Sequence, residues 1–163
     1  IPALFVYPMA FHNEDSEEGF IPKRASLDEV ITKDTLELNE IGGSFEAIAD
    51  RMDYLIDRIQ KYCLPELRKQ HIWREILIPG ESEIKLVNFL QSKGIQNCPF
   101  TECGAFLSTD DYVIRNLRTG RKLWINGTTS HLARNHHLLE KGNQYGISAR
   151  EFYEHFMLPS STI

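Results

Sequence analysis

The stretch CPFTECG, residues Cys98–Gly104, is the most informative part of the chain. It places two thiols on one short turn, with four residues between them. Two thiolates on such a turn can bind a single metal ion, and two imidazoles from a following helix can complete a tetrahedral shell. His131, His136 and His137 follow about thirty residues downstream and supply the candidate imidazoles. This constellation therefore predicts a bound metal ion.

The ligand types indicate which metal binds. Zinc favours thiolate and imidazole ligands in a four-coordinate shell, and its structural sites use protein ligands at all four positions. The spacing is Cys98-x4-Cys103-x27-His131, followed by His136 after four further residues or His137 after five. We therefore predict one Zn²⁺ held by both cysteines, His131 and one of the two later histidines.

Over residues 98–137 the chain resembles Cys2His2-type zinc modules, in which a cysteine-bearing turn and strands precede a helix with two histidines. The resemblance implies the ligand set given above and zinc as the cofactor. The spacer between the cysteines and histidines is much longer than the usual dozen residues, which leaves room for an additional hairpin. The DNA contacts of that family cannot be placed on this chain, so the resemblance does not imply DNA binding.

Residues 1–94 predict a mainly helical part with a short strand or two. Leu4–Tyr7 is expected to be a strand, and Asn13–Glu18 an acidic surface loop. Leu27–Leu38 fits either a helix or a strand. The 3.6-residue period of apolar side chains predicts a helix from Ser44 to about Tyr62, stopped by Pro65.

Two further elements are expected before the cysteines. Trp73–Ile78 is expected to be a strand. A second helix is expected to begin after Ser82, with Ile84, Val87 and Leu90 facing inward, and to end at Gly94.

Residues 95–163 predict a ββα module followed by a last helix. Tyr112–Asn116 and Lys122–Ile125 are expected to form a hairpin. Residues 128–130 offer caps for a helix through Glu140, and Ser148 begins a capping box for the last helix. The fold class is α+β, in a single domain: a mainly helical N-terminal part with a zinc-stapled ββα module near the C-terminus.

Composition and charge limit the functions to consider. The hydrophobic content of 42% can build a core without relying on the metal. The formal net charge of −5 gives no sign of a general nucleic-acid binder.

Three cysteines cannot all pair, which favours a reducing compartment: the cytoplasm, or the nucleus in a eukaryote. The chain does not begin with Met, which leaves its native N-terminus open.

A basic patch is the candidate partner surface. Arg115, Arg118, Arg121 and Arg134 lie on the predicted hairpin and helix, where they could meet phosphate or an acidic protein. Because successive strand residues face opposite sides of a sheet, the hairpin cannot present all of its cations on one face. We expect an unknown protein partner ahead of nucleic acid, and no membrane.

The function predicted from these features is an intracellular zinc-binding protein that acts as an interaction or regulatory module. The alternative is a metal-dependent hydrolase or nuclease, in which the zinc keeps an open position and a carboxylate acts as base. Glu102 and Glu140 are the acidic residues nearest the ligands in sequence. The stripe Glu46, Asp50, Asp53 and Asp57 is interpreted as the solvated face of its helix.

Overall fold

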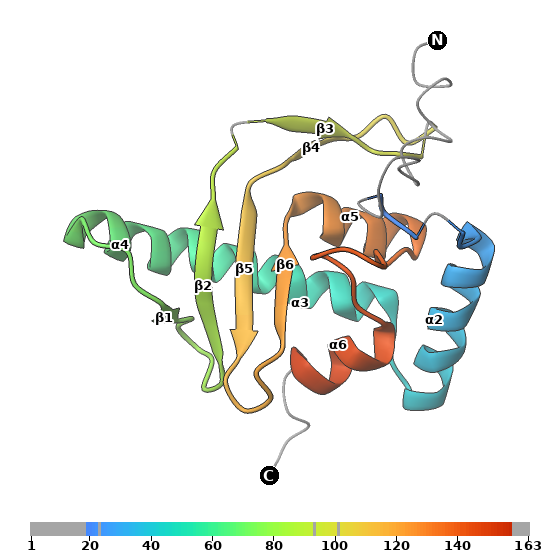
Figure 1. Ribbon diagram of the computed structural model, residues 1–163, viewed down its shortest axis with the longest axis horizontal. Coiled ribbons are helices and arrows are strands. Elements are labelled where there is room, and N and C mark those ends of the chain that lie inside the picture. Colours follow the sequence, from blue (N-terminus) through green and yellow to red (C-terminus); the bar gives the residue numbers. More distant parts are fainter. Residues whose placement is uncertain (1–18, 23, 93, 101, 158–163) are drawn as a thin grey trace.

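The computed structural model describes residues 19–22, 24–92, 94–100 and 102–157 (Figure 1). The predicted strand at 4–7 and the predicted loop at 13–18 lie outside this part of the chain. The described residues form the predicted mixed fold of helices and antiparallel sheets, with the candidate Cys2His2 group in its C-terminal half. None of the helices in these residues is long and apolar enough to cross a membrane.

Helices and strands follow one another along the chain as Figure 1 shows. The helices are α2 (Leu27–Ile41), α3 (Phe45–Arg58), α4 (Leu64–Gln70), α5 (Gly127–His136) and α6 (Ala149–His155), and a π-helical turn, η1 (Ile59–Cys63), joins α3 to α4. The strands are β1 (Ile76–Leu77), β2 (Ile84–Leu90), β3 (Ile95–Asn97), β4 (Phe106–Ser108), β5 (Asp111–Asn116) and β6 (Lys122–Ile125).

A four-stranded antiparallel sheet with strand order β1-β2-β5-β6 forms the centre of the fold. The predicted hairpin is confirmed as β5 and β6. Strands β3 and β4 pair separately, in a two-stranded sheet. They continue the chain beyond the ends of β2 and β5 and bend over α5 (Figure 1). We call β3, β4 and the loop between them the hairpin tip.

The predicted helix after Ser82 is wrong, because Ile84–Leu90 forms strand β2. Burial alternates at its start, with Ile84 and Leu86 buried and Lys85 partly exposed. The register with β5 then shifts between Leu86 and Asn88, so that Val87 occupies a bulge. The bulge interrupts the two-residue period and leaves apolar residues at a spacing that imitates a helix. The strand predicted over Trp73–Ile78 is shorter than expected, since only β1 pairs.

The helical N-terminal part differs from the prediction at Pro65. That residue was expected to stop the preceding helix, but α3 continues through η1 into α4, which ends at Gln70. Proline lacks an N–H and its ring clashes with the carbonyl four residues earlier. The wider π-helical turn before it opens the hydrogen-bond ladder, and Pro65 falls in the first turn of α4, where both defects are tolerated. The ambiguous segment after Ser26 is the helix α2.

Helix α5 is shorter than predicted and begins earlier. Its N-cap is Asn126, which forms a capping box with Thr129, whereas residues 128–130 had been expected to cap it. It ends at His136 rather than Glu140, because His137 adopts a left-handed conformation with φ of 54°. The capping box predicted at Ser148 is confirmed at the start of α6, with Glu151 as its partner.

The apolar side chains form two separate clusters. The main core lies between the four-stranded sheet, α3 and α6, and includes Leu55, Ile114 and Phe152, each fully buried. A smaller cluster lies under the hairpin tip. Its buried members are Ile21, Val30, Cys98, Leu132 and Leu138. The candidate site lies on this second cluster.

Candidate metal centre

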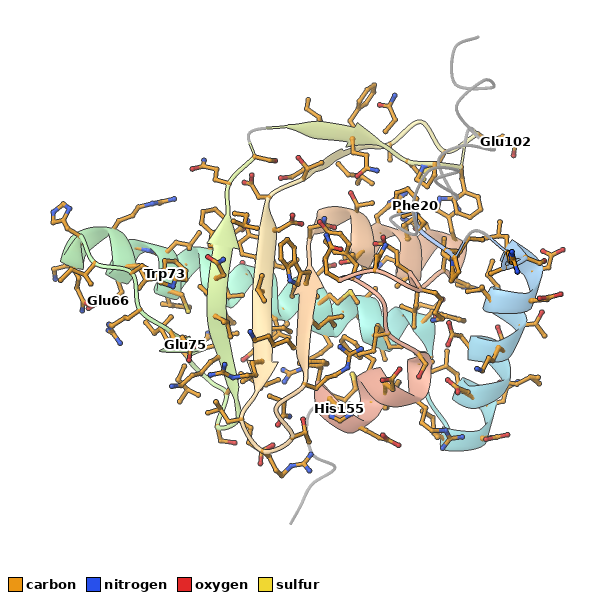
Figure 2. All side chains as sticks on the ribbon, in the orientation of Figure 1. Phe20, Glu66, Trp73, Glu75, Glu102 and His155 are labelled. Atoms are coloured by element: carbon orange, nitrogen blue, oxygen red, sulfur yellow. The ribbon has the colours of Figure 1, made fainter. Side chains whose placement is uncertain are left out.

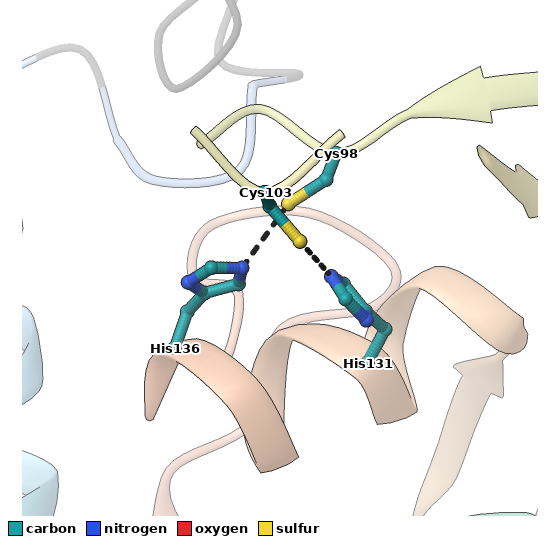
Figure 3. Close-up of side chains that lie close together, drawn as sticks. All are labelled: Cys98, Cys103, His131 and His136. Atoms are coloured by element: carbon teal, nitrogen blue, oxygen red, sulfur yellow. Dashed lines mark hydrogen bonds between the residues drawn. The ribbon is translucent and has the colours of Figure 1, made fainter. Parts of the chain in front are cut away.

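The two cysteines lie on the loop that joins β3 to β4, and backbone hydrogen bonds fix its shape. The Cys98 N–H donates to the Ala105 carbonyl at 3.0 Å, and the Cys103 N–H donates to the Phe100 carbonyl at 3.0 Å. Gly104 has φ of 68°, a left-handed conformation that glycine adopts without steric cost, and so returns the chain to β4. The loop directs both sulfur atoms toward α5 (Figure 3).

The two histidines project from α5 toward the cysteines (Figure 3). Residues five apart on a regular helix do not share a face as closely as residues three or four apart. Here the second histidine, His136, is the last residue of α5. Its ring lies edge-on to that of His131, with ring centres 5.2 Å apart. Phe100, from the cysteine loop, stacks on the His136 ring at 3.9 Å and holds its orientation.

The four side chains meet in pairs (Figure 3). Cys98 Sγ lies 3.3 Å from His136 Nε2, and Cys103 Sγ lies 3.2 Å from His131 Nε2. All four ligand atoms lie within 4.8 Å of one another. In a tetrahedral zinc site, the usual bond lengths place sulfur and nitrogen about 3.6 Å apart. The donor set fits a metal ion at the centre. The two sulfur–nitrogen pairs would open by a few tenths of an ångström, and the most widely spaced ligand atoms, within 4.8 Å now, would close to about 3.8 Å or less.

Burial sets the protonation of these groups before a metal binds. It raises the pKa of the Cys98 thiol to about 11, against the effect of the Phe100 backbone N–H, which hydrogen-bonds to it. Burial also lowers the pKa of His131 and of His136, which keeps both rings neutral. Neutral imidazoles are ready to coordinate, whereas the thiols must lose protons. A divalent cation supplies the positive charge that two adjacent thiolates need.

Asn135 supports the His131 ring from the next turn of α5. Its side-chain nitrogen Nδ2 lies 2.8 Å from His131 Nδ1. A histidine that binds metal through Nε2 carries its proton on Nδ1 and donates it to an outer partner. Turning the Asn135 amide by 180° exchanges Nδ2 for Oδ1, and the oxygen would then accept that proton when a metal ion occupies Nε2. Asn135 was not among the residues predicted from the sequence, although its position four residues after His131 places it beside that ring.

His137, the alternative fourth ligand, lies apart from the cluster. Its ring stacks on Phe45 at 4.9 Å, and its Nε2 lies 3.2 Å from Glu46 Oε1. The structure therefore brings His136, and not His137, to the two cysteines and His131. The third cysteine, Cys63, is fully buried in the main core.

The four arginines of the predicted patch are each engaged by carboxylates. Arg134 from α5 contacts Asp50 at 2.6 Å and Asp53 at 2.7 Å, both on the acidic stripe of α3. Asp50 and Asp53 of that stripe therefore link α3 to α5, whereas the stripe was expected only to face solvent. The other pairs are Arg115 with Glu75, Arg118 with Glu83, and Arg121 with Glu151. The arginines mainly tie neighbouring elements together.

The carboxylates considered for a hydrolytic site lie outside the cluster. Among the described residues, the one group with metal-binding geometry contains two cysteines and two histidines, and no carboxylate. Glu102 is exposed at the outer end of the hairpin tip (Figure 2). Glu140 is buried and accepts a hydrogen bond from Asn143 at 3.1 Å. Burial raises the pKa of Glu140 to about 8.

A comparison with protein-family models found no match, and comparisons with curated proteins and with solved structures found no significant match. The assignment of function therefore depends on the geometry of this chain.

Proposed function

We propose that this chain binds one zinc ion through Cys98, Cys103, His131 and His136, and that the ion is structural. The observation that supports this most directly is the approach of all four ligand atoms to within 4.8 Å of one another. Two soft thiolates with two imidazoles in a tetrahedral arrangement form a ligand set that suits zinc. Four protein ligands fill the shell, which favours a structural ion over a catalytic one with an open position.

The position of the site indicates what the zinc does. Cys98 and Cys103 belong to the hairpin tip, whereas His131 and His136 belong to α5. One ion bound to all four joins two segments that are more than 25 residues apart in the sequence. We propose that zinc holds the bent hairpin tip against α5, and that the small cluster beneath contributes less.

The biological role that fits this arrangement is an interaction or regulatory module in a reducing compartment. The three cysteines are free thiols, as zinc ligation and a reducing environment both require. A zinc-held tip gives a rigid surface without a large core, which suits binding to another macromolecule.

The zinc content of the protein purified without added metal tests the proposal. We expect close to one zinc per chain, and we expect Cys103→Ser and His136→Asn each to lose most of it. His137→Asn is the matched control for His136→Asn, since it makes the same change at the next residue, where asparagine tolerates the left-handed conformation. Cys63→Ala is the control for a cysteine in the main core. Full zinc in His136→Asn, or equal loss in His137→Asn, would contradict the ligand assignment.

A further inference from the structure

The two faces of the four-stranded sheet differ in what covers them. One face packs on α3 and contains the buried residues Leu86, Ile114 and Leu123. Figure 1 shows α3 behind the sheet and no helix in front of β2 and β5. Because directly paired residues of antiparallel strands point to the same side, the strand register identifies the side chains on the other face. We call that other face the open face.

Three cations lie side by side on the open face. Lys85 in β2 pairs with Arg115 in β5, which pairs with Lys122 in β6. Neighbouring strands lie about 5 Å apart, so the row spans about 10 Å across the sheet. Among the residues that the structure describes, neither lysine forms an ion pair. Arg115 contacts Glu75 at 2.6 Å, from the segment beside β1 (Figure 2).

An aromatic pair lies next to this row. Trp124 is partly exposed and pairs with Val113, each two residues along its strand from Lys122 and Arg115 and therefore on the same face. Tyr145 contacts Trp124 edge-to-face, with ring centres 5.9 Å apart. The Tyr145 hydroxyl donates to Asp111 at 2.8 Å, which fixes the tyrosine over the sheet. The open face thus combines a rigid aromatic platform with adjacent positive charge.

We propose that the open face binds single-stranded nucleic acid, with Lys85, Arg115 and Lys122 on phosphates and Trp124 against a base. Single strands are bound in general by cations that follow the backbone and aromatic rings that stack on bases. The open face carries these three cations against two carboxylates, Glu75 beside Arg115 and Asp111 beneath Tyr145. The exposed acidic residues Asp50, Asp53 and Asp57 belong to α3, behind the sheet, so cations outnumber carboxylates on the open face of a protein of net charge −5.

Single-stranded nucleic acid would be the partner of the interaction module proposed above, and this assignment rests on that proposed function. The residues of the open face are not those of the zinc site. The two are therefore tested separately: zinc content reports on the ligands, and oligonucleotide binding reports on the open face. Glu75 is expected to compete with phosphate for Arg115.

The test is a titration of the zinc-loaded full chain with a labelled oligothymidylate of about 15 nucleotides and a duplex of the same length. The Trp73→Phe variant leaves Trp124 as the sole tryptophan, so that its fluorescence reports stacking directly. We expect preferential binding to the single strand, quenching of Trp124, and a log–log salt slope of about −2 for three phosphate contacts. Inorganic polyphosphate and polyglutamate serve as polyanions without bases.

Variants separate the open face from general charge attraction. The double variant Lys85→Glu/Lys122→Glu is expected to weaken binding at least about tenfold, and Glu75→Gln to strengthen it. Lys61→Glu/Lys69→Glu, which reverses two exposed lysines on η1 and α4, makes the same charge change and is the matched control; it should leave binding unchanged. Absence of binding at low salt, or equal loss in Lys61→Glu/Lys69→Glu, would overturn the proposal. Equal affinity for polyglutamate without quenching of Trp124 would overturn it in favour of an acidic protein.

Discussion

The main core and the hairpin tip are stabilised by different means. Among the described residues, the main core cluster contains 23 buried apolar residues, whereas the cluster beneath the tip contains 5. The tip is built from strands of only three residues each, and it exposes Ile95 and Phe106 to solvent at 72%. Hydrophobic burial is sufficient to stabilise the main core, but it contributes little to the stability of the hairpin tip. A metal ion would therefore stabilise the tip far more than it would the main core.

Helix α5 belongs to both regions. Ala133 packs in the main core, while Leu132, one residue earlier, packs in the cluster beneath the tip. Arg134 joins α5 to α3 through two carboxylates, and the Asn126 capping box fixes its start. The proposed zinc ligands on α5 are therefore held by contacts that do not need a metal ion. The tip, in contrast, meets α5 through the small cluster, the stack of Phe100 on His136 and the four proposed ligands.

The largest effect is expected for a cavity in the main core. Leu55 is fully buried on α3, and Leu55→Ala should lower the free energy of unfolding by about 2–5 kcal/mol. Leu132→Ala, a matched truncation of a fully buried leucine in the smaller cluster, should cost clearly less, because its surroundings can collapse. Chemical denaturation of both variants in the presence of zinc measures the difference. Equal losses would mean that the two clusters form one cooperative core.

A second effect concerns Glu140 and pH. Burial raises its folded pKa from the ordinary value of 4.5 to about 8. The folded state keeps this proton while the unfolded state loses it, so this contribution to stability is complete below pH 4.5 and is lost as pH rises to about 8. Glu140→Gln keeps an acceptor for Asn143 and removes the titration. We expect it to stabilise the protein at pH 8 by about 4 kcal/mol.

The matched measurement for Glu140→Gln is the stability of wild type and variant at pH 5 and at pH 8, with and without a chelator. Among the described groups, those that shift the pKa of Glu140 are Asn143, Asp111 and Lys141, none of which is a proposed zinc ligand. The gain should therefore persist after chelation. A variant whose advantage is the same at both pH values would show that the carboxyl does not titrate in this range.

The smallest effect is expected at Asn135. Outer partners of ligating histidines typically contribute about 10–100-fold to metal affinity. Asn135→Ala removes the partner of His131 Nδ1 at an exposed helix position, where the truncation itself costs little. We expect weaker zinc binding in a competition with a chelating dye and unchanged stability of the metal-free protein. Asn135→Asp, which retains an acceptor, should recover the affinity; a loss as large as in Asn135→Ala would rule out the proposed hydrogen bond.

The sequence predicted the regular parts of the site and missed those that depend on tertiary structure. The hairpin β5–β6, helix α5 and the cysteine turn were recognisable because turn residues and periodicity are local signals. Strand β2 was taken for a helix because the bulge at Val87 breaks the two-residue period. The choice between His136 and His137 depended on where α5 ends, which the left-handed residue 137 determines. The carboxylates that pair with the four arginines come from elements distant in sequence, so no local pattern could predict that these arginines are engaged.

Hydrogen exchange with and without a chelator tests the central claim most directly, because it reports on the tip and the main core in one experiment. If zinc holds the tip, its removal should abolish amide protection in β3, β4 and the cysteine loop, including the N–H groups of Cys98 and Cys103. Protection in α3 and in the paired strands β2 and β5 should remain. Uniform loss along the chain, or an unchanged tip in protein shown to be free of zinc, would contradict the account.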